Sequence, residues 1–218
     1  MTFNLYGLVL GIAILASFQA SLWLAKERKI DIKVVEGLFW WVVAGGIVGA
    51  RAYHVIDKWQ EIYSLNPQSA FYIWNGGLAI WGAIIGGVTA LFLGVRVARV
   101  KIHRNDLLDV VFFGLPLGQA IGRWGNFFNN EIVGRNGEPL FLYESVLNLV
   151  LFAVIWGLRK RLTGKIAGFY LVGYGLIRVV LETYRQSGDQ WLVNGVSAAT
   201  IFSVAAGIGG AFLLRKKS

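Results

Sequence analysis

The stretch Leu5–Ala25, LYGLVLGIAILASFQASLWLA, carries no charged residue and runs directly into the basic sequence Lys26-Glu-Arg-Lys29. A membrane-spanning helix needs about 20 predominantly apolar residues, so this stretch predicts a helix that crosses a bilayer. No Lys or Arg precedes residue 26, and the stretch therefore lacks the basic start of a secretory signal peptide. We expect a retained transmembrane helix.

The rest of the chain repeats this pattern. Its 218 residues are 56% hydrophobic and 15% charged, with a mean hydropathy of +0.58, whereas soluble domains contain about 25% charged residues. This composition argues against a soluble domain and a disordered chain. The sequence predicts an all-α, polytopic membrane protein in which residues 1–218 form a single domain with seven transmembrane helices. The predicted segments are approximately Leu5–Ala25, Gly37–Ile56, Gly77–Val97, Leu107–Ile121, Phe141–Leu158, Gly168–Thr183 and Val193–Leu214.

The basic residues alternate between the connections of these segments. Most of the 21 Lys and Arg residues follow the first, third, fifth and seventh segments, in clusters that begin at Lys26, Arg96, Arg159 and Arg215. Because cytoplasmic loops carry the excess of Lys and Arg, we expect the N-terminus outside and the C-terminus in the cytoplasm. The net charge of +9 is then explained by topology and by contacts with anionic membrane lipids, and no nucleic-acid partner is expected.

Ionisable residues within or beside membrane segments are costly and often functional. In the predicted topology they gather in the outward half, at Arg51, His54, Arg123, Glu131, Glu144, Arg178, Glu182 and Arg185. Neutral polar groups join them, namely Tyr6, Gln119, Asn126, Asn129, Tyr143 and Tyr174. This one-sided distribution predicts a polar site that opens to the outer leaflet or to the water outside.

Two segments concentrate this polarity. Residues 122–135, GRWGNFFNNEIVGR, combine glycines that permit tight turns with arginines, whose forked donors suit phosphate; an ordinary polar loop is the alternative. In residues 173–185, GYGLIRVVLETYR, Arg178 and Glu182 share a helix face. Either Glu182 orients Arg178 toward an anionic ligand, or the two form a structural ion pair. The Gly-rich residues 75–87 are typical of close helix packing.

Two outward arginines at lipid depth indicate a phosphate ligand, and phospholipid is the phosphate most available there. Three kinds of protein remain open on the residues alone: a lipid-modifying enzyme, a non-catalytic protein that binds anionic lipid, and an anion transporter. A transporter predicts polar residues that reach both faces or an internal repeat, and the sequence has neither pattern. The chain contains no Cys, so it has no thiolate nucleophile or Cys-based metal site of its own.

Residues 122–135 resemble the signature G-R-x-G-N-F-x-N-x-E-x-x-G-R of the bacterial prolipoprotein diacylglyceryl transferase family along its whole length. Further stretches are similar to other elements of that family and occur in the family's order, namely Tyr6–Leu8, Gly49–Arg51, Gly76–Gly87, Pro139–Glu144 and Gly173–Gln190. The resemblance implies transfer of the diacylglyceryl group of phosphatidylglycerol to the thiol of the lipobox cysteine in a prolipoprotein signal peptide, with glycerol phosphate released. It implies a seven-helix protein of the bacterial cytoplasmic (inner) membrane that works at the outer face without a metal or cofactor.

The resemblance also implies residue roles. It assigns catalysis to Tyr6, Arg123, Asn126, Arg178 and Glu182. It assigns substrate binding to Arg51, Trp81, Asn129, Glu131, Gly134, Tyr143, Glu144, Tyr174 and Arg185. In this scheme Arg123 and Arg178 hold the phosphate and stabilise charge on the leaving group, and Glu182 orients Arg178. The two asparagines bond lipid oxygens, Glu131 braces the signature loop, and Arg51 adds positive potential.

The chain departs from the family's pattern at two places. Trp81 occupies a position where many members carry a His that is often proposed as the base, and an indole cannot take a proton. His54 is the substitute candidate for that base. Many members also insert a sizeable outward segment after the signature, whereas only Asn136-Gly-Glu138 separates Arg135 from Pro139 here. We therefore expect this insertion to be reduced or absent near residues 135–139.

Overall fold

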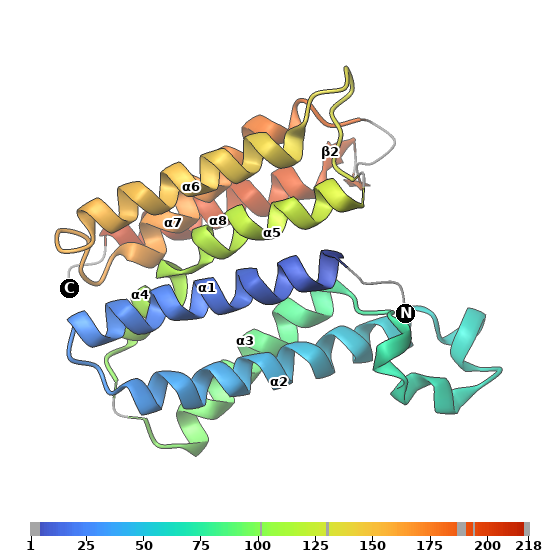
Figure 1. Ribbon diagram of the computed structural model, residues 1–218, viewed down its shortest axis with the longest axis horizontal. Coiled ribbons are helices and arrows are strands. Elements are labelled where there is room, and N and C mark those ends of the chain that lie inside the picture. The colour runs from blue at the N-terminus through green and yellow to red at the C-terminus, as the bar shows by residue number, and fades with distance from the viewer. Residues whose placement is uncertain (1–4, 101, 130, 187–190, 194, 216–218) are drawn as a thin grey trace. The chain divides into compact units, whose positions relative to one another are not determined.

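The computed structural model describes residues 5–100, 102–129, 131–186, 191–193 and 195–215 (Figure 1). These residues are predominantly helical. The α-helices are α1 (Leu5–Glu27), α2 (Ile32–Asp57), α3 (Ile80–Val97), α4 (Arg104–Phe113), α5 (Leu115–Phe128), α6 (Leu140–Leu158), α7 (Ile166–Glu182) and α8 (Ala198–Arg215). Within the described residues, the strands β1 (Leu192–Val193) and β2 (Val196–Ser197) form one short antiparallel hairpin.

Helices occupy each of the seven predicted apolar segments, but the fourth is divided. α4 and α5 meet at Gly114, and Pro116 lies in the first turn of α5. Proline has no backbone N–H and is tolerated in a first turn but not in a helix interior. Gly114 also packs so closely on Ser17 of α1 that a Cβ would overlap the Ser17 carbonyl. The apolar run continues through this break, which is why the sequence predicted one element.

Five of the described helices, α1, α2, α3, α6 and α8, are long and apolar enough to cross a membrane. The chain is thus consistent with a multi-pass membrane protein. The remaining helices are shorter, and two of them, α5 and α7, carry Arg123 and Arg178. Seven crossings and the direction of the termini stay predictions.

The chain divides into two compact units, and the single domain expected from the sequence stays a prediction. The smaller unit is formed by Lys29–Lys101. Its helices α2 and α3 pack as a hairpin, and added Cβ atoms on Gly45, Gly49, Gly82 and Gly86 would overlap the facing helix. Small residues allow such close approach of membrane helices. The connection between the helices contains η1 (Trp59–Tyr63), η2 (Pro67–Phe71) and η3 (Ile73–Asn75).

The larger unit combines Met1–Arg28 with Ile102–Ser218. In it α5 packs against α1 and α6, and α7 packs against α4, α6 and α8 (Figure 1). At one end of this unit, the fully buried Asp109 of α4 accepts hydrogen bonds from Arg28 Nη1 at 2.7 Å, Gly164 N at 2.6 Å and Ile166 N at 2.8 Å. The end of α1, α4 and the α6–α7 connection therefore meet at this end.

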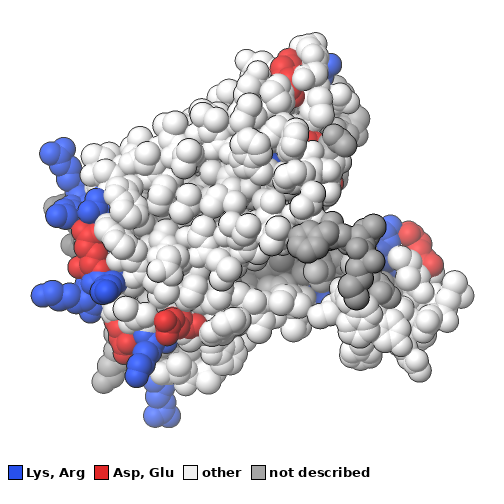
Figure 2. Space-filling model, viewed as in Figure 1, with Lys and Arg blue, Asp and Glu red and all other residues white. Residues whose placement is uncertain are grey.

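The charges of the larger unit lie at its two ends. Arg159, at the same end as Asp109, pairs with Glu27 at 2.8 Å and lies over the rings of Trp23 and Trp156. On the face that Figure 2 shows, the described side chains between the two ends are uncharged. An apolar band bounded by charged ends is the pattern of a protein that contacts lipid on its sides.

Candidate active site

A cluster of paired charges lies in the larger unit, away from the Asp109 end. It is built where α5 and α7 end and α6 begins. Its members, called the polar cluster below, are Arg123, Asn126, Glu131, Glu144, Tyr174, Arg178, Glu182 and Arg185. Because α6 and α7 are joined by a short connection and run back along each other, a residue early in α6 and residues late in α7 reach the same level.

Glu144 joins the two central arginines. Its Oε1 accepts from Arg123 Nη2 at 2.6 Å, and its Oε2 accepts from Arg178 Nη1 at 3.2 Å. The Tyr174 hydroxyl donates to Oε1 at 3.3 Å. Glu144 is only 1% exposed, and a buried carboxylate is tolerated when it is paired and hydrogen-bonded. One carboxylate from α6 thus fixes the distance between an arginine of α5 and an arginine of α7.

Glu182 holds the other side of Arg178. Arg178 Nη2 donates to Glu182 Oε2 at 3.3 Å, and Arg185 Nη1 lies 3.8 Å from the same oxygen. The Ser197 hydroxyl donates to Glu182 Oε1 at 2.5 Å. Sequence reasoning missed Ser197; its only signal is a polar residue immediately before an apolar helix.

The end of α5 forms a second branch of the polar cluster. Arg123 Nη1 donates to Asn126 Oδ1 at 3.3 Å, and Asn126 Nδ2 donates to Glu131 Oε2 at 2.8 Å. Asn129 Nδ2 donates to Glu131 Oε1 at 3.1 Å. The Glu131 carboxylate therefore connects the amides of both asparagines, which is the geometry expected of a brace for the loop that follows α5.

The loop from Glu131 to Pro139 packs on the end of α7. Gly134 N donates to Glu138 O at 2.8 Å, and Arg135 N donates to Tyr184 O at 2.9 Å. A Cβ on Gly134 would meet the carboxylate end of Glu138, so a larger residue here would displace that side chain. Glu138 lies in this loop, and the Asn136 side-chain amide and backbone N–H both donate to its carboxylate. These bonds hold the pKa of Glu138 below its usual value, with the side-chain bond contributing most.

Two further predicted tyrosines lie near this cluster. The Tyr6 ring of α1 packs on Gly125 of α5, where an added Cβ would lie 2.9 Å from Tyr6 Cδ2. Tyr143 precedes Glu144 and is 43% exposed. Tyr174, inside the cluster, stacks on Tyr170, whose hydroxyl donates to Gln119 Oε1 at 2.9 Å. Asn130, Asp189 and Gln190 of the matching sequence stretches lie outside the described residues.

Arg51, His54 and Trp81 belong to the smaller unit and are described within it. Arg51 is 8% exposed, and within the described part of the chain its guanidinium donates to backbone carbonyls. The bonds reach Ser69 O at 2.6 Å, Ala70 O at 2.8 Å, Tyr72 O at 3.3 Å, Gly76 O at 2.6 Å and Gly77 O at 3.1 Å. An arginine has five N–H donors, so this loop uses all of them.

The other two residues of the smaller unit have different surroundings. His54 Nδ1 lies 3.0 Å from the Tyr63 hydroxyl, and Tyr63 is buried below the Arg51 guanidinium. Trp81 lies in the first turn of α3 and is 37% exposed. Among the described residues, no three His, Asp or Glu side chains lie together in a way that could hold a metal ion.

The geometry of the polar cluster suits an anionic ligand. Three arginines, Arg123, Arg178 and Arg185, belong to the cluster together with three glutamates, so the formal charges balance and each arginine is held by hydrogen bonds or ion pairs. The side chains of Arg123 and Arg178 remain 23% and 15% exposed. Arginine binds phosphate through parallel, charge-assisted hydrogen bonds, and here two arginines are fixed in advance by a shared partner.

Comparison with known proteins supplies an independent result. A family model described as prolipoprotein diacylglyceryl transferase matches residues 1–215. A phosphatidylglycerol–prolipoprotein diacylglyceryl transferase from Synechococcus elongatus is 38% identical over 92% of this chain and 78% of its own length. Proteins of the same name from Nostoc sp. and Finegoldia magna are 35% and 32% identical, over 96% and 95% of this chain and 84% and 88% of their own lengths.

Proposed function

The chain belongs to the prolipoprotein diacylglyceryl transferase family, and on that premise we propose that it transfers the diacylglyceryl group of phosphatidylglycerol to the thiol of the lipobox cysteine of a prolipoprotein. It crosses the bacterial inner membrane seven times, with the N-terminus and the site at the outer face. The observation that carries the proposal is the pair of arginines, Arg123 and Arg178, held by the buried Glu144 beside an apolar helical surface.

The reaction exchanges one bond to carbon for another. The cysteine sulfur forms a bond to the glyceryl carbon that carries the phosphate, the C–O bond breaks, and its electrons leave with glycerol phosphate. The thiol proton passes to a base, because the thiolate is the nucleophile. The phosphodiester begins with one negative charge, and the leaving phosphomonoester gains a second. Donors aimed at this growing charge stabilise the transition state more than the ground state.

The arginine pair meets that requirement because its positions are set before the lipid binds. Glu144 spaces the two guanidinium groups, and Glu182 with Ser197 fixes the far side of Arg178. Preorganised charge costs no rearrangement at the moment of reaction. Asn126 and Asn129, ordered by Glu131, contact lipid oxygens, and Tyr6 and Tyr174 border the same place.

The group that takes the thiol proton must be a residue other than Trp81, because an indole cannot take a proton. His54 stays the candidate, and its ring nitrogen Nδ1 is 3.0 Å from the Tyr63 hydroxyl. Replacing His54 with Asn or Gln tests this assignment: loss of transfer with binding of phosphatidylglycerol retained supports His54 as the base, and unchanged transfer rules it out.

A thiol-modification assay tests the function. The purified protein is mixed with phosphatidylglycerol liposomes and a lipobox peptide that contains one cysteine, and the peptide mass is followed. We expect a gain of one diacylglyceryl group, reduced at least a hundredfold by Arg123→Ala and by Arg178→Ala. Arg161→Ala is the matched control, because Arg161 is an exposed arginine near the Asp109 end.

Other outcomes would identify another class of protein. Tight binding of phosphatidylglycerol with no mass gain by the parent protein would indicate a non-catalytic lipid-binding protein. Phosphate or glycerol phosphate flux across the liposomes without peptide modification would indicate a transporter.

A further inference from the structure

Gln119 belongs to the outward polar residues of the sequence but has no part in the reaction described above. Its Oε1 accepts a hydrogen bond from the Tyr170 hydroxyl at 2.9 Å. Tyr170 is 4% exposed, and its ring also lies against the Phe112 ring of α4, with 5.5 Å between the ring centroids. Buried tyrosines pack their rings and find a partner for the hydroxyl. Here α4 supports the ring and α5 supports the hydroxyl of one residue of α7.

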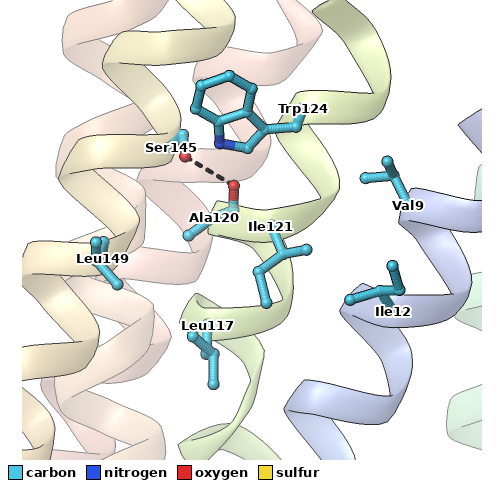
Figure 3. Close-up of a pocket in the computed structure, with 8 residues that line it drawn as sticks. All are labelled: Val9, Ile12, Leu117, Ala120, Ile121, Trp124, Ser145 and Leu149. Atoms are coloured by element: carbon cyan, nitrogen blue, oxygen red, sulfur yellow. Dashed lines mark hydrogen bonds between the residues drawn. The ribbon is translucent and has the colours of Figure 1, made fainter. Parts of the chain in front are cut away.

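The backbone that carries Gln119 is itself held against α6. Ser145 Oγ of α6 donates to the backbone oxygen of Ala120 of α5 at 2.7 Å (Figure 3). These two residues directly follow Glu144 and Gln119 in the sequence, so the bond sets the height of α5 against the helix that carries the bridging carboxylate. Gln119 therefore holds Tyr170 from a fixed support.

Tyr170 reaches the polar cluster through one stacked ring. At four-residue intervals along α7 lie Tyr170, Tyr174, Arg178 and Glu182. Residues four apart on a helix are neighbours on its surface, and the rings of Tyr170 and Tyr174 are stacked, with 5.6 Å between centroids and 5° between planes. This spacing lies within the range of favourable offset aromatic pairs. The position of the first ring thus restricts the position of the second.

The Tyr174 hydroxyl needs such a restriction. It donates to Glu144 Oε1 at 3.3 Å, and the same oxygen accepts from Arg123 Nη2 at 2.6 Å. The hydroxyl bond is longer than most O–H···O bonds in proteins, so a small movement of the Tyr174 ring would break it. A hydroxyl at this oxygen offsets part of the negative charge that Arg123 would otherwise compensate alone.

We propose that Tyr170 is a positioning residue for transfer: held by Gln119, its ring keeps Tyr174 where the hydroxyl reaches Glu144. The inference rests on the proposed function and adds a supporting layer one turn before Tyr174 on α7. While the hydroxyl shares Glu144 Oε1, more of the positive charge of Arg123 is left for the leaving phosphate. Loss of the support should therefore lower kcat more than it raises KM.

Double-mutant kinetics test whether Tyr170 acts through Tyr174. Tyr170→Leu removes the ring, and we expect kcat for modification of the lipobox peptide to fall about tenfold, with KM for phosphatidylglycerol within about twofold of the parent. Tyr170→Phe keeps the ring and should lose no more than about threefold. Tyr174→Phe removes the hydroxyl that reaches Glu144, and in that background Tyr170→Leu should lower kcat by less than about twofold.

The Tm and a matched control separate this role from packing. Tyr170→Leu should lower the Tm by the same amount in both backgrounds, because the packing that it removes does not depend on the Tyr174 hydroxyl. A residue that acts only on packing would lower kcat equally in both backgrounds as well. Tyr53→Phe is the control, since it removes a hydroxyl from a 42% exposed tyrosine of α2 in the smaller unit, and its kcat should match that of the parent.

An NMR measurement of ring motion needs no turnover. The tyrosines are labelled with carbon-13 at both Cε atoms, and the Tyr174 signals are identified by their loss in Tyr174→Phe. A ring that flips slowly gives two Cε signals, and a ring that flips fast gives one averaged signal. In detergent micelles we expect two signals from Tyr174 in the parent and in Tyr53→Phe, and one averaged signal in Tyr170→Leu.

The outcomes distinguish this proposal from the function on which it rests. An active parent in which Tyr170→Leu lowers kcat by the same factor in both backgrounds overturns the positioning role alone. One averaged Tyr174 signal in the parent, or two signals that persist in Tyr170→Leu, also overturns it. A parent that transfers nothing, but whose two Tyr174 signals merge in Tyr170→Leu, supports the hold of Tyr170 on Tyr174 and refutes the transferase.

Discussion

Arg51 and the Arg123–Arg178 pair both lie near the ends of apolar helices, but their guanidinium groups have different partners. Arg51 donates to five backbone carbonyls of one connection, whereas the pair donates to the carboxylates of Glu144 and Glu182. An arginine whose donors are all used by backbone organises that backbone. An arginine that is paired with carboxylates and partly exposed is oriented and still reachable by an anion.

The different partners separate Arg51 from Arg123 and Arg178, although the family resemblance assigns all three to the same site. Arg51 was expected to add positive potential to a lipid site, and its long-range charge is still present. Its hydrogen-bonding capacity, however, is spent on residues 69–77. We therefore expect substitutions at Arg51 to act mainly on the structure of that connection, and substitutions at the pair or its partners to act mainly on transfer.

The most severe test of the comparison is Glu144→Ala. It leaves two largely buried guanidinium groups without their shared partner, and breaking a buried ion pair costs about 3–5 kcal/mol. We expect transfer to fall more than a hundredfold and the Tm in detergent to drop. Glu144→Gln, which keeps the size and one accepting oxygen, should recover part of both losses. Full activity in Glu144→Ala would show that the arginines need no such spacer.

Arg51→Ala should disturb the structure of the α2–α3 connection more than it lowers transfer. The substitution removes five hydrogen bonds that tie the backbone of residues 69–77 to α2, so the connection between α2 and α3 should become sensitive to protease there. Transfer should fall less than in Arg123→Ala when both are measured at a temperature where each variant is folded. A loss of transfer as large as that of Arg123→Ala, without new cleavage, would place Arg51 among the phosphate ligands.

Ser197→Ala tests how much the support of the Glu182 carboxylate contributes to transfer. It removes the hydrogen bond to Glu182 Oε1 while the Arg178 contact to Oε2 remains. A hydrogen bond to a charged group contributes about 1.5–3 kcal/mol, and only part of that reaches the transition state. We expect kcat to fall by about tenfold or less with KM unchanged. Ser203→Ala is the control, since that hydroxyl bonds a carbonyl within its own helix. A change in KM alone would indicate a direct lipid contact.

The smallest effect is expected for the pKa of Glu138. Its carboxylate accepts hydrogen bonds from uncharged donors. Its pKa is lowered by bonds from Asn136, so the stabilisation is present above the ordinary Glu pKa and is lost as the pH falls through the lower, folded value. A carbon NMR titration of the Glu138 carboxyl should show a pKa below the usual value of a glutamate, and Asn136→Ala should move it back toward that usual value. A titration unaffected by Asn136→Ala would mean that the side-chain amide is not the main cause.

Much of the fold, and many of the residues of the candidate site, could be predicted from the sequence, because both depend on local patterns of residues. Apolar length located α1 and α6, and the i, i+4 spacing placed Arg178 beside Glu182. Contacts between elements could not be predicted in this way. That Glu144 bridges two arginines depends on how α5, α6 and α7 are aligned, and that Arg51 binds carbonyls depends on the path of an irregular connection. The break at Gly114 was hidden because apolar composition continues across it.

The buried Asp109 has a consequence for the order in which the protein is made. Arg28 precedes Asp109 in the chain, but Gly164 and Ile166, its other two partners, follow it by 55 and 57 residues. While α4 and α5 emerge from the ribosome, those backbone donors do not yet exist, so the carboxylate has Arg28 alone to offset its burial. α4 can therefore settle fully only after the α6–α7 connection has been synthesised. A product truncated after α5 therefore lacks two of the three hydrogen-bond partners of the Asp109 carboxylate.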